Sequence, residues 1–384
     1  MTSVWPKGVP ALVLIMAVIS LSCASFSEPA ATEPPAAAVF DIRTFGARGD
    51  DSTDDTAAIQ RAIDAAAEAD GATVRLSKGL FHVNSTLELK SGVTLTGQGG
   101  KTVLFMPARE HSTPLLYADR GENVTVEDLV LRSEGPHSEV YAISMTGQKG
   151  STLRNLRIEN VQVGVKLGSG DLSANWVVSD LVVQKSRLPF FVADVHDSTF
   201  RRIRLEGGAP PGERPVNAYI HNNVQDCVFE DFSLTRPAGH ALQVWPEGTE
   251  TLTARLVFRR VLVDASASGY PLALGGDGSA KVEDIEFHDL TAVGANRRDR
   301  AIFMLSEPAG ILVDGFNARG SDFLVRQYRG ANANEVVFMN GNFVGERFEY
   351  GSPAITNLTI DGSVSLNGSI RSSVELPRSI TPLR

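Results

Sequence analysis

Residues 126–131 read VEDLVL, and seven segments of the same pattern follow along the chain. In each, an apolar residue, two polar or small residues and a second apolar residue lead into a strand-like run. The second apolar residue recurs every 22 to 29 residues, a period typical of a solenoid in which stacked units bury one continuous core. The further segments are LRNLRI at 153–158, VSDLVV at 178–183, FRRIRL at 200–205, FEDFSL at 229–234, FRRVLV at 258–263, FHDLTA at 287–292 and VDGFNA at 313–318.

The residue types within each repeat indicate strands. β-Branched and alternating apolar residues are separated by Gly, Asn, Asp and Ser, and helical periodicity is scarce beyond one early segment. The Leu and Asn pattern of leucine-rich repeats, the competing solenoid, is absent. The sequence therefore predicts an all-β fold, a parallel β-helix solenoid.

One helix is predicted at the start of the solenoid. The stretch DDTAAIQRAIDAAAEA at 54–69 carries an apolar stripe made of Ile59, Ala62, Ile63 and Ala66. A solenoid has an open end that exposes core side chains and unpaired strand edges. We therefore expect this helix to cap that end.

Four of the six residues from Asp50 to Asp55 are aspartates. Thr53 or Asp54 can accept hydrogen bonds from the first free amides of the helix, and further carboxylates favour its positive N-terminal end. A calcium loop is the functional alternative, but the spacing is not that of an EF-hand. Helix capping is the preferred interpretation.

Three motifs near the N-terminus are similar to a known signature. FGARGDDSTDDTAAIQRAI at 45–63, GATVRLSKGLFHV at 71–83 and SGVTLTGQG at 91–99 resemble the opening of the pectate-lyase-like superfamily of right-handed parallel β-helices. That superfamily includes polygalacturonases, rhamnogalacturonases and phage tailspike depolymerases. The resemblance implies the fold and polysaccharide as the substrate class. It implies no single reaction, because the superfamily includes hydrolases, lyases, epimerases and binding members.

The first 24 residues have the pattern of a secretory signal peptide. Lys7 precedes the apolar run VPALVLIMAVISL at 9–21, and Ser22 and Ala24 suit cleavage after Ala24. Lipid attachment at Cys23 is the alternative. The run is too short for a transmembrane segment. We expect an exported protein that is periplasmic, secreted or lipid-anchored at the cell envelope.

Composition bounds the rest of the chain. Residues 25–38 are rich in Pro, Ala and Glu and are predicted to be a disordered linker, followed by a single β-helix domain over 39–384. Cys227 alone lies in that domain, which excludes an intrachain disulfide or a zinc site built on a cysteine pair. The net charge of −9 argues against nucleic acid as a partner. The oligomeric state is left open.

The second strand of each coil was aligned to find side chains on one outer face. The second and fourth positions of AISM (142–145), GVKL (164–167), FFVA (190–193), AYIH (218–221) and ALQV (241–244) are expected to point inward. The residues then expected on the outside could line a groove that follows a chain of sugars. They are Lys166, Asp194, Asn217, Asn222, His240, Gln243, Trp245, Tyr270 and Arg300.

The resemblance to polygalacturonases implies hydrolysis but is incomplete. Asp194 in VAD and His240 in GHALQVW match two of that family's coils, whereas Asn222 and Asn223 replace its paired carboxylates. Hydrolysis of a glycosidic bond requires two carboxylates. The spacing of the acidic residues offers another arrangement, because three of them lie 30 residues apart and would stack about one strand spacing from one another. These are Glu247, Asp277 and Glu307.

A lyase would use different residues. β-Elimination beside a uronate carboxylate requires a base for the C5 proton and a cation that neutralises the carboxylate. His240 or Tyr270 is the candidate base or acid, and Arg300 or Lys166 the candidate cation. Trp245 is the candidate sugar-stacking platform. The further substrate-binding candidates are Lys166, Asn217, Asn222 and Gln243.

We therefore expect an exported enzyme that degrades a uronate-containing, pectin-like polysaccharide, with glycoside hydrolysis placed ahead of elimination. The alternatives are a polysaccharide lyase that uses His240 or Tyr270 with Arg300, and a carbohydrate-binding or scaffold β-helix without catalysis. No cofactor is expected, with calcium as the alternative.

Overall fold

The structure is a computed structural model that describes residues 38–372 apart from 209–215, 267–269, 277–278, 295–302, 307, 328–332, 351–354 and 362–363. Within this part it contains one α-helix, α1 (Thr56–Glu68), a 3₁₀ turn, η1 (Ile42–Phe45), and many short strands. The strands are β1 (Val39–Asp41), β2 (Asp50–Asp54), β3 (Thr73–Arg75), β4 (Gly79–His82), β5 (Leu87–Glu88), β6 (Thr94–Thr96), β7 (Thr102–Phe105), β8 (Thr113–Asp119), β9 (Thr125–Arg132), β10 (Val140–Thr146), β11 (Thr152–Glu159), β12 (Val163–Ala174), β13 (Val177–Ser186), β14 (Leu188–His196), β15 (Thr199–Gly207), β16 (Ala218–Thr235), β17 (His240–Val244), β18 (Leu252–Asp264), β19 (Tyr270–Gly275), β20 (Lys281–Val293), β21 (Phe303–Ser306), β22 (Pro308–Gln327), β23 (Ala333–Tyr350), β24 (Ile355–Ile360) and β25 (Ser365–Ser372).

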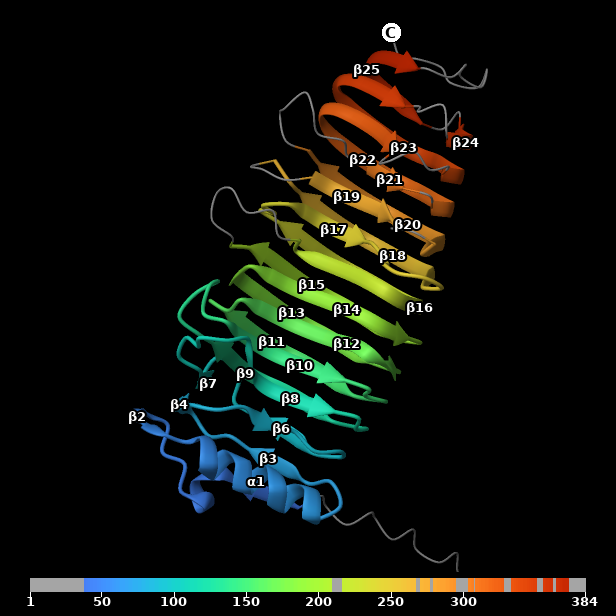
Figure 1. The fold of residues 1–384 in the computed structure, drawn as a ribbon. Helices are drawn as coiled ribbons and strands as arrows, with labels where there is room; N and C mark the ends of the chain where they lie inside the picture. Colours follow the sequence, from blue (N-terminus) through green and yellow to red (C-terminus); the bar gives the residue numbers. More distant parts are fainter. Residues whose placement is uncertain are drawn as a thin grey trace, which may run out of the picture. The chain divides into compact units, whose positions relative to one another are not determined.

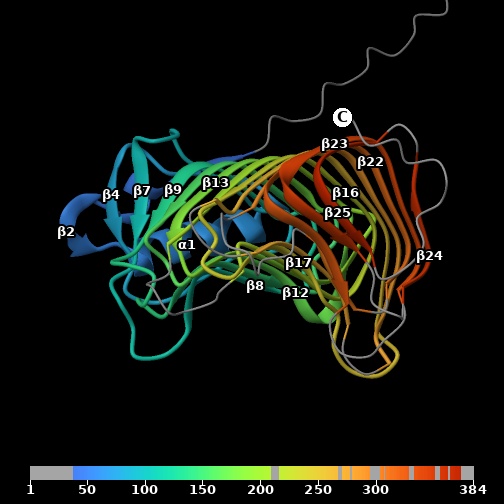
Figure 2. The ribbon, with the colours of Figure 1, turned by 90° about the horizontal axis from the view of Figure 1, so that it is seen from above.

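The strands stack in parallel, coil upon coil, which confirms the predicted parallel β-helix (Figure 1). One series of neighbours runs β8, β10, β12, β14, β16, β17, β19, and another runs β9, β11, β13, β15. Seen from above, β8, β12 and β17 lie on one side of the solenoid, and β9 and β13 lie on the other (Figure 2). The first series carries the residues of the functional site.

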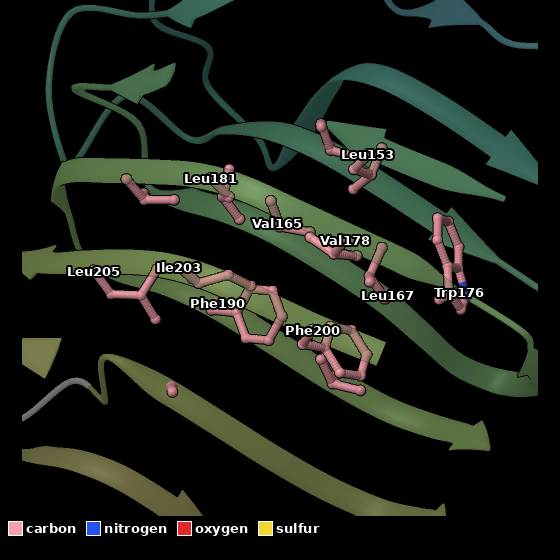
Figure 3. Packing of buried hydrophobic residues seen from close by; sticks show 14 of the residues in the cluster. Leu153, Val165, Leu167, Trp176, Val178, Leu181, Phe190, Phe200, Ile203 and Leu205 are labelled. Atoms are coloured by element: carbon pink, nitrogen blue, oxygen red, sulfur yellow. The ribbon is translucent and has the colours of Figure 1, made fainter. Parts of the chain in front are cut away.

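The repeat seen in the sequence corresponds to one coil. Leu129, Leu156, Leu181 and Ile203 pair in register on β9, β11, β13 and β15, and each is at most 2% exposed. Equivalent side chains of successive coils therefore pack on one another, and Figure 3 shows Leu181 and Ile203 among the apolar residues that fill the interior. The polar residue before each of them adopts a left-handed conformation, which Asn and Asp tolerate well.

A column of phenylalanines extends the core. Phe200, Phe229, Phe258 and Phe287 stack with nearly parallel rings at centroid distances of 4.8, 4.7 and 4.7 Å. This spacing matches the separation of neighbouring strands, so a parallel coil places identical rings face to face. The stack extends from β15 to β20, and Phe229 lies on β16, one of the strands that carry the site.

The helix forms the predicted cap. It lies at the N-terminal end of the solenoid (Figure 1), and Ile59, Ala62, Ile63 and Ala66 are fully buried against the first coil. The apolar stripe identified in the sequence therefore faces the open end. Within the described residues, no helix is long and apolar enough to cross a membrane.

The aspartates before the helix have structural partners. Asp54 Oδ1 accepts a hydrogen bond from the Thr56 amide at 3.0 Å, which confirms Asp54 as a capping side chain. Asp55, 1% exposed, accepts bonds from the amides of Arg48 and Gly49. The amide of Thr53 bonds to Asp50 and lowers the pKa of that carboxyl to about 2. In the described part of the chain, no group of three or more acidic, histidine or cysteine side chains is arranged to hold a metal ion.

Candidate active site on the outer face of the coils

One outward row of side chains crosses the middle coils. Lys166 of β12, Phe191 of β14, Tyr219 of β16 and Gln243 of β17 occupy equivalent positions on neighbouring strands. Because parallel strands lie about 4.8 Å apart, such a row presents one side chain per coil along a line. An extended polysaccharide lying along the coils would contact them one after another.

An aromatic and basic cluster occupies the centre of this row. The ring centroids of Phe191 and Tyr219 are 5.6 Å apart, and those of Tyr219 and His221 are 4.9 Å apart. Lys166 Nζ lies 5.9 Å from the centroid of the Phe191 ring, so Phe191 separates this cation from the rings of Tyr219 and His221. The cluster therefore combines a phenol, an imidazole and an ammonium group on an accessible strand face.

Hydrogen bonds to the next coil orient the two rings. His221 Nδ1 lies 2.8 Å from the carbonyl oxygen of Trp245. A carbonyl can only accept, so Nδ1 carries the hydrogen and the neutral ring keeps a lone pair on Nε2. The Tyr219 hydroxyl lies 3.4 Å from both the Trp245 carbonyl and Glu247 Oε1. The arrangement thus provides a base and a proton donor two residues apart on one strand.

Tyr219, His221 and Phe191 were not among the residues predicted from the sequence. The alignment placed the second and fourth residues of FFVA and AYIH inside, and this is wrong for these two coils. In the structure Phe190, Val192, Ala218 and Ile220 are buried, and of the four residues predicted to be inside only Ala193 is buried as well. A shift of one residue moves every side chain of a strand to the opposite face. The usable signal was His221, since the predicted register would have buried a histidine in the core.

Asp194 lies at a turn beside the row. It is 8% exposed and has a left-handed backbone, with φ of 53°. Its Oδ2 accepts a bond from the Gly170 amide and its Oδ1 accepts one from Asn223 Nδ2, each at 3.0 Å. The carboxylate therefore joins turns of three successive coils.

Other predicted sugar contacts belong to the walls of the solenoid. Asn217 is 2% exposed and donates to the Thr235 carbonyl at 2.8 Å. The Asn222 side chain approaches the Glu247 amide at 3.4 Å. Trp245 was expected to be exposed, and this is wrong: the side chain is 7% exposed. Trp245 contributes to the site through its backbone carbonyl group, which His221 contacts.

His240 and Tyr270 form a second pair on the same side. They occupy paired positions at the beginning of β17 and β19, and their ring centroids are 5.2 Å apart. Gln243 lies three residues after His240 and directly beside Tyr219 in the row. Asp277 and Arg300, together with Glu307, lie outside the described residues, so the predicted column of three acids is represented by the exposed Glu247 alone.

Comparison with known families agrees with this architecture. Residues 39–109 match the model of the family described as rhamnogalacturonase A/epimerase, pectate lyase-like. The chain is therefore similar to pectate-lyase-like proteins over its first coils, and its described strands form a parallel β-helix. This result confirms the resemblance seen in the N-terminal motifs, and the matched region covers the capping helix and the first coils.

Several proteins that are similar to this chain in sequence have names that describe enzymes acting on polysaccharides. Mannuronan C5-epimerase AlgE1 of Azotobacter vinelandii is 35% identical over 186 residues, which is 42% of this chain and 13% of the epimerase. Alginate lyase 7 of the same organism is 30% identical over 177 residues, 40% of this chain and 21% of the lyase. The matches thus span well under half the length of these relatives.

Solved structures share the fold. The A-module of mannuronan C-5 epimerase AlgE6 from Azotobacter vinelandii superposes with a TM-score of 0.64 at 16% identity, covering 90% of this chain and 99% of the module. A tailspike protein of E. coli bacteriophage HK620 gives a TM-score of 0.68 at 13% identity, covering 86% and 67%. At these identities the likeness is one of fold.

Proposed function

We propose that this pectate-lyase-like β-helix modifies a uronate polysaccharide by removing the proton at C5 of a sugar unit. The observation that carries the proposal is the cluster of Lys166, Tyr219 and His221 on one outward face. Epimerisation and β-elimination of uronates both begin with this proton, and both need a base and a cation at the carboxylate.

His221 is assigned the role of base. Its Nδ1 hydrogen is held by the Trp245 carbonyl, so Nε2 can take the C5 proton. The electron pair of the C5–H bond then moves into the carboxylate, which gains negative charge. The Lys166 ammonium, two positions along the row from Tyr219, is assigned to stabilise that charge.

Tyr219 is assigned the role of proton donor. In epimerisation its hydroxyl proton goes to C5 on the face opposite the one that lost its proton to His221, which restores a saturated sugar of inverted configuration. In β-elimination the C4–O4 bond breaks, a C4–C5 double bond forms, and the phenolic proton goes to the departing O4. The hydroxyl proton is available for either step because Tyr219 faces outward beside His221.

Glycoside hydrolysis has weaker support from the same face. It requires two carboxylates on either side of the scissile bond. Glu247 is the carboxylate that contacts Tyr219 in the described part of the chain, at 3.4 Å. The cluster is otherwise phenol, imidazole and ammonium, which favours proton transfer at carbon.

The names of the relatives guide the choice of substrate. Mannuronan epimerases and an alginate lyase match this chain in sequence, so we propose a polyuronate substrate and take mannuronan as the first probe. The export expected from residues 1–24 suits a polymer that lies outside the cell.

The deciding experiment is incubation of the purified full chain with mannuronan in D₂O. Deuterium incorporated at C5 without absorbance from unsaturated uronate indicates epimerisation, and absorbance with new reducing ends indicates β-elimination. Both outcomes support the proposal. New reducing ends without unsaturation would establish hydrolysis, and the absence of exchange and cleavage across a panel of polyuronates would favour a binding protein.

A further inference from the structure

Two adjoining cavities lie away from the cluster, toward the N-terminal coils. The larger, about 460 Å³, is lined by residues that follow β5, β8 and β10 and by Asp171 and Leu172 of β12. The smaller, about 290 Å³, shares Ser91, Arg120 and Gly121 with it and extends to Glu88 and Tyr117. Together they form a continuous depression across several coils.

The smaller cavity lies on the row that contains the cluster, and the larger cavity adjoins it through Ser91, Arg120 and Gly121. Glu88, Tyr117, Ser144 and Lys166 are paired in register from β5 through β8 and β10 to β12. Four strand steps separate Tyr117 from Tyr219, a distance of about 19 Å at one strand spacing of 4.8 Å per step. A polymer that lies along the row at the cluster therefore reaches the smaller cavity several sugar units away, and the larger cavity lies beside this path.

The lining suits a sugar that carries a carboxylate and hydroxyl groups. Arg120 is neutralised by Asp171 at 2.7 Å, whereas Lys149, in the described part of the chain, makes no ion pair. Leu172 is 55% exposed, which is unusual for so large an apolar side chain, and offers contact to the C–H face of a sugar ring. The exposed carboxylate of Glu122 can accept hydrogen bonds from hydroxyl groups.

The wall that carries Asp171 and Leu172 is held in place. Asp194 Oδ2 accepts the Gly170 amide in the middle of this turn. Gly168, with φ of 74°, approaches the Ala193 carbonyl so closely that a Cβ atom would lie 1.7 Å from its oxygen. The turn is therefore fixed to the next coil, so this wall of the cavity is preorganised for ligand binding.

We propose that the cavity bounded by Arg120, Lys149 and Leu172 is a remote subsite for a uronate unit of the polysaccharide chain. Lys149 binds its carboxylate, and Leu172 contacts its ring. This inference rests on the proposed function for its substrate class. It adds that the protein recognises long chains through contacts beyond those to the reacting sugar.

The test measures binding rather than turnover. Mannuronan tetramer and decamer are titrated calorimetrically into the full chain carrying Tyr219→Phe, so that the ligand is not converted. Lys149→Ala and Leu172→Ala are then added singly. The matched controls are Lys101→Ala, an exposed lysine beside β7, and Leu262→Ala, a 37% exposed leucine on β18.

The decamer is expected to bind more tightly than the tetramer. Each subsite variant should weaken decamer binding roughly fivefold, the size expected for a partly exposed contact, and leave tetramer binding unchanged. The control variants should alter neither. Equal affinity for both lengths, an equal loss for both lengths, or no binding of either oligomer would overturn the subsite. Failure of the proposed function would instead appear as loss of C5 exchange and cleavage by the wild-type chain while length-dependent binding persisted.

Discussion

His221 Nδ1 lies 2.8 Å from the carbonyl oxygen of Trp245 on the next coil. This contact sets the tautomer of the imidazole, because the carbonyl accepts a hydrogen that Nδ1 must carry. The buried indole of Trp245 holds that carbonyl in place. A base on one coil is therefore oriented by the backbone of its neighbour.

Replacement of His221 by Gln should abolish most turnover. General-base catalysis contributes roughly 10²- to 10⁴-fold, and an amide cannot accept the C5 proton. The measurement is the rate of C5 deuterium exchange or of unsaturated product. His288→Gln, on β20 beside Glu286, is the matched control and should leave the rate unchanged. Full activity of His221→Gln would remove His221 from the mechanism.

Tyr219→Phe should separate catalysis from binding. The variant keeps the ring that packs on Phe191 and His221 but loses the proton donor, so the rate should fall by about 10² or more while polymer affinity changes little. Rate constants and binding constants for mannuronan measure the two effects. Tyr141→Phe on β10 serves as the control, and an unchanged rate for Tyr219→Phe contradicts the assignment.

Asp194→Ala should destabilise the protein. Loss of the carboxylate leaves the Gly170 amide and the Asn223 side chain without their acceptor, at a cost of about 1–3 kcal/mol in the free energy of unfolding. Chemical denaturation measures this cost. Asp197→Ala is the control, because Asp197 has the same left-handed backbone but an exposed side chain. Equal stability of the two variants would show that the Asp194 bonds are dispensable.

Cys227 should resist thiol reagents in the folded protein. Burial raises the pKa of its thiol to about 12, so the reactive thiolate is scarce at pH 8. An exposed thiol titrates near about 8.5, and the folded state therefore favours the neutral form. That stabilisation is fully present below pH 8.5 and is lost as the pH rises toward 12. Rapid labelling of the native protein at pH 8 would contradict the assignment, and labelling in denaturant is the positive control.

The fold could be predicted because its information is local and repeated. Leu129, Leu156 and Leu181 mark the same position of successive coils, and each strand pairs with the strand one period away. The capping helix was likewise visible in the stripe of Ile59 and Ile63. The spacing of the repeat is enough to predict the fold, because every coil contacts only its neighbours.

The residues of the site could not be predicted without knowing which alternate side chains of each strand face the core and which face outward. We call this choice the phase of the strand. FFVA and AYIH fit either phase, since aromatic and small residues are compatible with both faces of a coil. Pairing of Phe190 with Val165 and of Ala218 with Phe190 resolves the choice and turns Phe191, Tyr219 and His221 outward. This phase is a property of stacked strands rather than of one segment.

The sequence by itself determined a capped parallel β-helix, because the period of apolar residues sets the coil and the apolar stripe of Ile59 and Ile63 sets the cap. The tertiary structure alone decided which side chains meet. Asp194 is buried against Gly170 and Asn223, each more than twenty residues away, while the half-buried Tyr219 and His221 face outward on β16. Burial and contact depend on the neighbouring coils, and no single segment contains them.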